Sequence, residues 1–72
     1  MKAKINIDTL NSINRFVEIC SRLNYKINLI DGDQYCVSAK SLIGAIATMD
    51  WSDVYVECSH DIRSYIEEFL AE

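Results

Sequence analysis

Proline is absent from this 72-residue sequence, glycine occurs twice and histidine once. The chain therefore has no glycine-rich loop of the kind that cradles phosphates, and no paired histidine or cysteine ligands spaced for a metal ion. No segment approaches the roughly 20 apolar residues of a membrane helix, and the opening MKAKINI lacks the apolar stretch of a signal peptide. We expect a cytoplasmic protein that holds no cofactor or metal, does not contact membranes and catalyses no reaction itself.

Positive charge and cysteine are also scarce. Seven Lys and Arg residues stand against eleven Asp and Glu residues, and the basic positions are spread along the chain, with a net charge of -4. Because phosphate binding normally needs a clustered basic face, nucleic acid is not an expected partner. Cys20, Cys36 and Cys58 are odd in number, far apart and without a Cys-x-x-Cys. They are typical of a reducing compartment, and we expect buried or half-buried free thiols.

Half of the residues are hydrophobic and a quarter are charged, which is the composition of a folded globular domain. We expect a single domain over residues 1–72, which at this size buries only roughly 60% of its unfolded surface. KAKINI (2–7) alternates polar and apolar residues as a half-buried strand does, with Ala3, Ile5 and Ile7 inward. Residues 8–12 then supply turn and cap side chains for a helix that runs to about Asn24. Its apolar positions recur at helical spacing: Ile13, Phe16, Val17, Cys20 and Leu23.

A β-hairpin is predicted by YKINLI (25–30) and QYCVS (34–38), which flank the turn sequence DGD (31–33). Asp31 and Gly32 can take the positive backbone angles of a tight turn, and Ile27 and Leu29 should face the core. Residues 41–48 then predict a short helix, in which Gly44 costs about 1 kcal/mol relative to alanine.

The last part of the chain predicts one more strand and one more helix. VYVEC (54–58) alternates, with Val54, Val56 and Cys58 inward, and residues 62–70 carry the apolar spacing of an amphipathic helix. The resulting order is β-α-β-β-α-β-α. Because each strand has one apolar face, we predict an α+β open-faced sandwich, a four-stranded antiparallel sheet with helices on one face.

Ser41, at the start of the short helix, admits two roles. As an N-cap its hydroxyl accepts a backbone N–H, a contact worth about 1 kcal/mol relative to alanine. As a modification site it suits a phosphate, which would meet free amides and a favourable dipole, with Lys40 adjacent. The two roles are compatible, and the residues alone leave open whether the second is used.

The segment VSAKSLIGAIAT (37–48), together with the length and the order of elements, resembles HPr, the small phosphocarrier protein of the bacterial sugar phosphotransferase system. In that family a hairpin leads into a Lys-Ser-aliphatic-x-Gly stretch that opens a short helix. Lys40, Ser41, Leu42 and Gly44 match this stretch. NRFVEICSRLNYKINLI (14–30) is similar to the first helix and second strand of the family. The resemblance covers about residues 2–70 and implies the same HPr-like fold.

The carrier site of that family does not match. It is a Gly-Leu-His-Ala-Arg-Pro stretch at the start of the first helix, where this sequence reads IDTLNSINRF (7–16). Thr9, Leu10 or Asn11 stands in place of the histidine, depending on the gap placed in the shorter loop. A carrier needs an imidazole nitrogen with a labile bond to phosphorus, whereas threonine would form a stable ester. His60 follows the last strand, whose end should lie near Lys2 and far from the start of the first helix. We therefore expect His60 to be an exposed residue that does not replace the carrier histidine.

The resemblance implies a regulatory role, because one branch of the family lacks the carrier histidine and keeps the serine. In some members a dedicated kinase phosphorylates this serine, and the protein then binds a transcription factor. The leading hypothesis is an HPr-like binding protein linked to the sugar phosphotransferase system and switched at Ser41, with an HPr-type serine kinase and a transcription regulator as partners. Its predicted docking residues are Lys40, Leu42, Ile43, Ile46, Met49 and Trp51.

The same residues are compatible with alternatives. Leu42 and Ile46 could fill one edge of the core, and Trp51 could be a core or lid residue. The second hypothesis for function is a stand-alone adaptor or oligomerisation domain of the same fold, unrelated to sugar transport, with Ile43, Ile46 and Trp51 buried in a self-contact.

Overall fold

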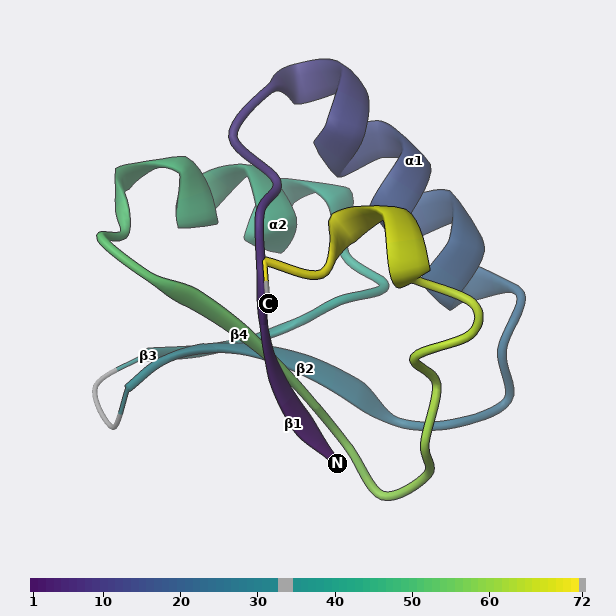
Figure 1. The fold of residues 1–72 in the computed structure, drawn as a ribbon. Helices are drawn as coiled ribbons and strands as arrows, with labels where there is room; N and C mark the ends of the chain where they lie inside the picture. The colour runs from purple at the N-terminus through teal and green to yellow at the C-terminus, as the bar shows by residue number, and fades with distance from the viewer. Residues whose placement is uncertain (33–34, 72) are drawn as a thin grey trace.

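In the computed structural model, which describes residues 1–32 and 35–71, four strands form one antiparallel sheet in the order β1-β4-β2-β3. The strands are β1 (Lys2–Ile5), β2 (Ile27–Asp31), β3 (Tyr35–Ser38) and β4 (Val54–Cys58). The helices α1 (Leu10–Ser21) and α2 (Leu42–Ala47) lie on one face of this sheet (Figure 1). The predicted α+β open-faced sandwich is thereby confirmed.

The sheet has one apolar face because its strands alternate in register. Ala3, Val56, Leu29 and Val37 are paired across the four strands and form a row on the inner face. The neighbouring row, on the open face, includes Lys4 and Tyr55. The core combines the inner face with the buried side of α1, and its strand residues are those that the alternation predicts: Ala3, Ile5, Ile27, Leu29, Val54, Val56 and Cys58.

Helix α1 begins where a capping box satisfies its first amides. Thr9 has an extended backbone and its Oγ1 accepts a hydrogen bond from the Ser12 amide at 3.1 Å, while the Thr9 amide donates to Ser12 Oγ at 3.2 Å. The helix buries Ile13 and Phe16 against the sheet and ends at Ser21, three residues before the predicted end. No helix within the described residues is long and apolar enough to cross a membrane.

The two strands of the hairpin, β2 and β3, pair as predicted. Asp31 is the last residue of β2 and lies outside the turn, and Gly32 alone among the described residues has a positive φ, at 55°. Gly32 suits this position because it has no Cβ to clash. The rest of the predicted turn and the first residue of the predicted second strand, residues 33 and 34, lie outside the described residues.

The predicted final helix is wrong in type. Residues 63–66 form turns and Glu67–Phe69 a single 3₁₀ turn, with the Tyr65 amide donating to the Ile62 carbonyl at 2.9 Å. The segment still buries its apolar positions, and Phe69 meets Phe16 edge to face, with ring centroids 5.2 Å apart. The chain then turns alongside β1, where the amide of Ala71 donates to the carbonyl of Lys4 at 3.0 Å. If residues 62–70 formed one continuous α-helix, the extended end of the chain could not also pair with the edge of β1.

Candidate protein-binding surface

Ser41 is the N-cap of α2, as predicted. Its backbone is extended (φ -99°, ψ 116°), and its Oγ accepts a hydrogen bond from the Gly44 amide at 3.2 Å. The Ser41 carbonyl accepts the first helical hydrogen bond, from the Ala45 amide at 2.8 Å. The side chain remains exposed. One hydroxyl therefore caps the helix and stays accessible from outside.

Helix α2 packs against the rest of the protein through its small residues. Ala45 is fully buried, and Thr48 is buried with its hydroxyl donating to the Ala45 carbonyl at 2.6 Å. A Cβ added at Gly44 would lie 3.2 Å from the Cβ of Val37 on β3, closer than side chains normally approach. Small residues at these positions let the helix lie close to the sheet, and the bulky residues between them point outward.

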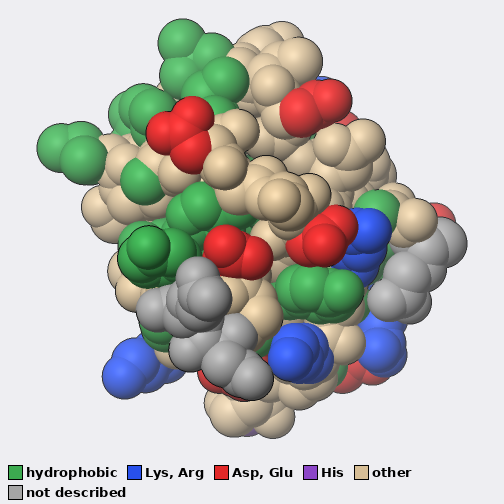
Figure 2. Space-filling view, turned by 90° about the vertical axis from the view of Figure 1, so that its left-hand side faces the viewer, with side chains coloured by type: hydrophobic (Ala, Val, Ile, Leu, Met, Phe, Trp, Pro, Cys, Tyr) green, Lys and Arg blue, Asp and Glu red, His purple; other side chains and the backbone are tan. Residues whose placement is uncertain are grey.

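The outward residues form an apolar surface, called here the α2 surface and made up of Leu42, Ile43, Ile46 and Met49. Their exposed fractions are 42%, 85%, 38% and 49% respectively. Leu10, the first residue of α1, is also exposed. Figure 2 shows hydrophobic side chains gathered on one side of this face of the molecule. Leu42 and Ile46 thus leave a large part of their side chains accessible, and the core side of α2 is filled by Ala45.

Trp51 lies at the border of the α2 surface. It is half-buried against the core, and its ring stacks on that of Tyr35 with centroids 6.1 Å apart and planes at 21°. The indole therefore links the connection that follows the 3₁₀ turn η1 (Thr48–Asp50) to strand β3. Trp51 therefore acts largely as a lid residue over the core, and part of its ring stays accessible.

Lys40 makes a contact that the sequence does not predict. Its ammonium donates a hydrogen bond to the carbonyl of Leu23 at 2.6 Å, just beyond the C-terminal end of α1. A cation at this position interacts favourably with the negative end of the helix dipole. The Lys40 ammonium is therefore held at the end of α1, and it ties the end of one helix to the start of the other.

The residues that the resemblance aligns with the carrier histidine lie at the start of α1. Thr9, Leu10 and Asn11 form the start of α1, and the Thr9 hydroxyl is occupied by the capping box, 2.8 Å from Ser12 Oγ. The only histidine of the chain, His60, is exposed and stacks on Tyr25 with ring centroids 4.0 Å apart. It follows the end of β4, which lies at the opposite end of the molecule from the start of α1 (Figure 1).

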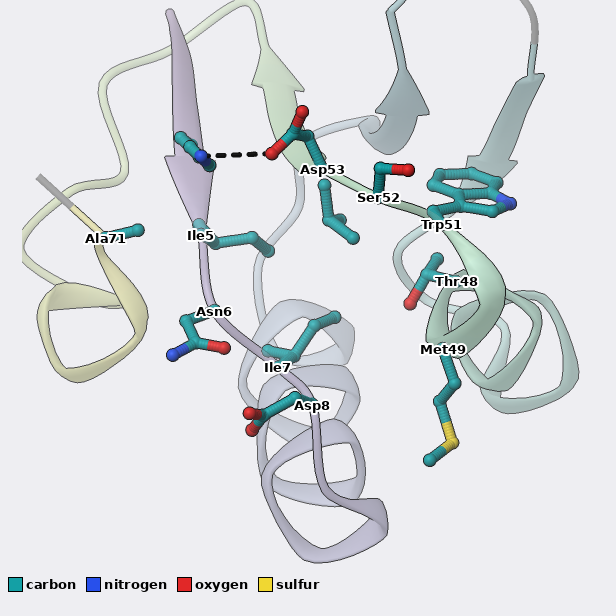
Figure 3. Close-up of a pocket in the computed structure, with 12 residues that line it drawn as sticks. Ile5, Asn6, Ile7, Asp8, Thr48, Met49, Trp51, Ser52, Asp53 and Ala71 are labelled. Carbon is teal, nitrogen blue, oxygen red and sulfur yellow. Dashed lines mark ion pairs between the residues drawn. The ribbon is translucent and has the colours of Figure 1, made fainter.

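A cleft of about 320 Å³ lies next to the α2 surface, between the β1–α1 connection and the η1–β4 connection. Figure 3 shows it, with the labelled Ile5 and Ile7 on one side and Thr48 and Met49 on the other. The Lys4 ammonium lies 3.0 Å from the Asp53 carboxylate at one end. This hydrogen bond and the negative charge of Asp53 raise the pKa of Lys4, so the lysine stays protonated.

The cysteines offer no further site. Cys20 and Cys58 are buried, as expected, whereas Cys36 is exposed, which corrects the expectation of a buried or half-buried thiol. The reason is its register: Cys36 pairs with Ile30 in the row of the open face. Burial and the nearby Cys58 raise the pKa of the Cys20 thiol to about 12, so it is an inert thiol. Within the described part of the chain, no three His, Cys, Asp or Glu residues group as metal ligands.

Comparison with known proteins identifies the fold. No protein-family model matches the sequence, and neither does any curated protein. Among solved structures, the fold is similar to that of HPr-C-His from Thermoanaerobacter tengcongensis, with a TM-score of 0.69 and 20% sequence identity. The match covers 93% of this chain and 83% of the other. The chain thus has an HPr-like fold, in agreement with the resemblance of its sequence.

Proposed function

We propose that this chain is a cytoplasmic regulatory protein of HPr-like fold, linked to the sugar phosphotransferase system, that binds protein partners through the α2 surface. The observation that carries the proposal is the orientation of α2. This six-residue helix buries Ala45 and exposes Leu42, Ile43 and Ile46. An apolar surface that the fold itself does not cover is a common mark of a protein interface.

The start of α1 supports a binding role rather than histidine-based transfer. Thr9, Leu10 and Asn11 stand where the labile phosphoryl group would be carried, and the Thr9 hydroxyl is hydrogen-bonded within the helix cap. A threonine phosphate is a stable ester and does not pass its group on. His60 follows the end of β4, at the opposite end of the molecule from the start of α1, and is not placed to replace the imidazole. These residues therefore favour partner binding over histidine-based phosphoryl transfer.

Phosphorylation of Ser41 is the proposed switch. The Ser41 side chain is exposed and stands next to Leu42 at one end of the α2 surface, and its hydroxyl accepts a hydrogen bond from the Gly44 amide. A phosphate there would add about -1.5 to -2 charges beside an apolar surface. Such a change alters which partner can dock without a change of fold. An HPr-type serine kinase and a transcription regulator are the proposed partners.

The test uses Ile43→Asp, with Tyr65→Asp as the matched control. Both side chains are exposed apolar residues, and Tyr65 lies in the C-terminal segment, outside the α2 surface. Because Ile43 is 85% exposed, its burial contributes only roughly 0.3 kcal/mol of the 1.5–3 kcal/mol of a fully buried side chain. Ile46 is less suitable for this test because more of its side chain is buried.

The measurement is the intact mass after incubation with ATP and an HPr-type serine kinase. We expect one added phosphate in the wild type and in Tyr65→Asp, none in Ser41→Ala, and much less in Ile43→Asp, because the kinase must dock on the α2 surface. No added phosphate in the wild type would refute the switch. Equal phosphorylation of Ile43→Asp would show that the kinase does not use this surface.

The alternative function, an adaptor or oligomerisation domain unrelated to sugar transport, rests on the same exposed side chains. A self-contact through Ile43, Ile46 and Trp51 would make the chain a dimer in sedimentation experiments, and Ile43→Asp would restore the monomer. A monomeric wild type would exclude it.

A further inference from the structure

The α2 surface and the cleft form one continuous region. Met49 belongs to the α2 surface and also lines the cleft, and in Figure 3 its side chain points towards the start of α1, with Asp8 on the opposite side of the cleft. The bottom of the cleft is apolar, because the buried side chains of Ile5, Ile7 and Val54 reach it. A partner that covers the α2 surface therefore meets a recess beside it, deep enough for a side chain.

Carboxylates dominate the charge around this region. Asp8 and Asp53 line the cleft, and Asp50 lies in η1 between Met49 and Trp51. Asp53 is paired with Lys4, whereas Asp8 and Asp50 form no ion pair within the described residues. Figure 2 shows acidic side chains next to the hydrophobic area. The nearest lysine in sequence to the α2 surface, Lys40, is directed to the Leu23 carbonyl.

We propose that the occupant of this surface is a cationic, apolar segment of a partner protein, with a Lys or Arg side chain in the cleft beside Asp8. This inference rests on the proposed function and adds the chemistry of the partner. The apolar side chains of the segment cover Ile43, Ile46 and Met49. The methylene stem of the Lys or Arg lies on the apolar bottom of the cleft, and its charged end reaches the carboxylates, as amphipathic side chains commonly do.

The size and the charge of the region favour this occupant over two others. A volume of about 320 Å³ is at the lower limit for small-molecule pockets, and it suits one or two side chains better than a cofactor. A second copy of the chain carries the same carboxylates at this surface and a net charge of -4, so like charges would meet. Complementary charge on a different protein removes this repulsion and speeds association.

The experiment selects binders from a random 12-residue peptide library displayed against the full chain. We expect the selected peptides to combine apolar residues with a net positive charge. Their affinity should fall about tenfold in the double variant Asp8→Asn/Asp50→Asn and again when salt is raised from about 50 to about 500 mM. The matched control is Glu57→Gln/Glu67→Gln, which removes two exposed carboxylates on other elements and should leave the affinity unchanged.

The outcomes separate this inference from the proposed function. Acidic or uncharged peptides that lose binding in Ile43→Asp would overturn the cationic partner and leave docking on the α2 surface intact. Peptides that bind the wild type, Ile43→Asp and Asp8→Asn/Asp50→Asn with the same affinity would overturn both proposals. If no peptide is selected, the region is not a peptide-binding surface and the inference is refuted. Cationic peptides that depend on both variants would establish it.

Discussion

Replacing Lys40 by methionine should weaken the fold, although the sequence places this residue among the docking residues. The Lys40 ammonium donates to the Leu23 carbonyl at 2.6 Å, and these residues are 17 positions apart in the chain. The contact satisfies a carbonyl just beyond the end of α1 and places a positive charge at the negative end of its dipole. Methionine keeps most of the aliphatic stem and removes only the charge and the hydrogen bond.

The expected loss of unfolding free energy is about 1 kcal/mol. A cation near a helix C-terminus contributes about 0.3–1 kcal/mol, and a net hydrogen bond about 0.5–1.5 kcal/mol; the exposed position of Lys40 reduces both. At about 2.1 cal/mol/K per residue, the unfolding entropy of a 72-residue chain is about 0.15 kcal/mol/K. A loss of 1 kcal/mol therefore lowers the melting temperature by about 7 °C.

The assay is thermal and urea unfolding followed by circular dichroism, with Lys26→Met as the control. Lys26 is also an exposed lysine, and it forms no hydrogen bond or ion pair through its side chain within the described residues. The reasoning is refuted if the two variants unfold at the same temperature. If Lys40→Met were as stable as the control but lost partner binding, the docking role predicted from the sequence would be the correct one.

Four smaller predictions test the helix cap, the approach of α2 to β3 and the cysteine thiols. Thr9→Ala should destabilise the protein by about 1 kcal/mol in urea unfolding, because it removes the cap of α1; no change would show that the capping box is dispensable. Gly44→Ala should leave stability nearly unchanged, because the gain of about 1 kcal/mol in helix propensity is opposed by the contact with Val37; a full gain would mean that β3 shifts freely. At pH 8 a thiol reagent should label Cys36 but not Cys20, whose pKa is raised by burial from 9.0 to about 12. The Cys20 thiol ionises at lower pH in the unfolded chain than in the folded one, so the stability that its proton contributes should be lost as pH rises from about 9 towards 12. If the free energy of unfolding falls no more steeply in the wild type than in Cys20→Ala over this range, the prediction is wrong.

The strands and α1 could be predicted because their signals are local. Alternation places Ala3 and Val56 on the inner face whatever strand they pair with, and a helical spacing places Phe16 in the core. The final segment shows the limit of this reasoning. Ile62, Ile66 and Phe69 recur every three or four residues, a spacing that suits an α-helix and a series of tight turns equally well. The choice between them depends on the β1 edge, more than 60 residues earlier, to which Ala71 donates a hydrogen bond.

The candidate site was predictable in part for the same reason. Ser41 as a cap follows from its immediate neighbours, and the exposed Ile43 could be named from its place in a short apolar helix. The sequence does not indicate that Ala45 is the buried residue of α2, because this depends on how closely the helix approaches β3. The cleft has no signal in the sequence at all. Its walls come from residues 6–8 and 51–53, and no short-range pattern marks two connections that only the sheet order brings together.

Taken together, the two proposals predict the direction in which phosphorylation of Ser41 acts. Because the Lys40 ammonium is held at the Leu23 carbonyl, the charge of a phosphate at Ser41 would be offset chiefly by the partial positive charge at the start of α2, and most of it would remain. It would add to the carboxylates Asp8 and Asp50 and so strengthen binding of a cationic segment, by about threefold to tenfold at low salt for charges that interact through water. The measurement compares the affinity of one selected cationic peptide for the phosphorylated and the unmodified chain at about 50 and about 500 mM salt, where the difference should shrink. Weaker binding after phosphorylation would show that the phosphate blocks the α2 surface by its bulk, and that the switch releases partners.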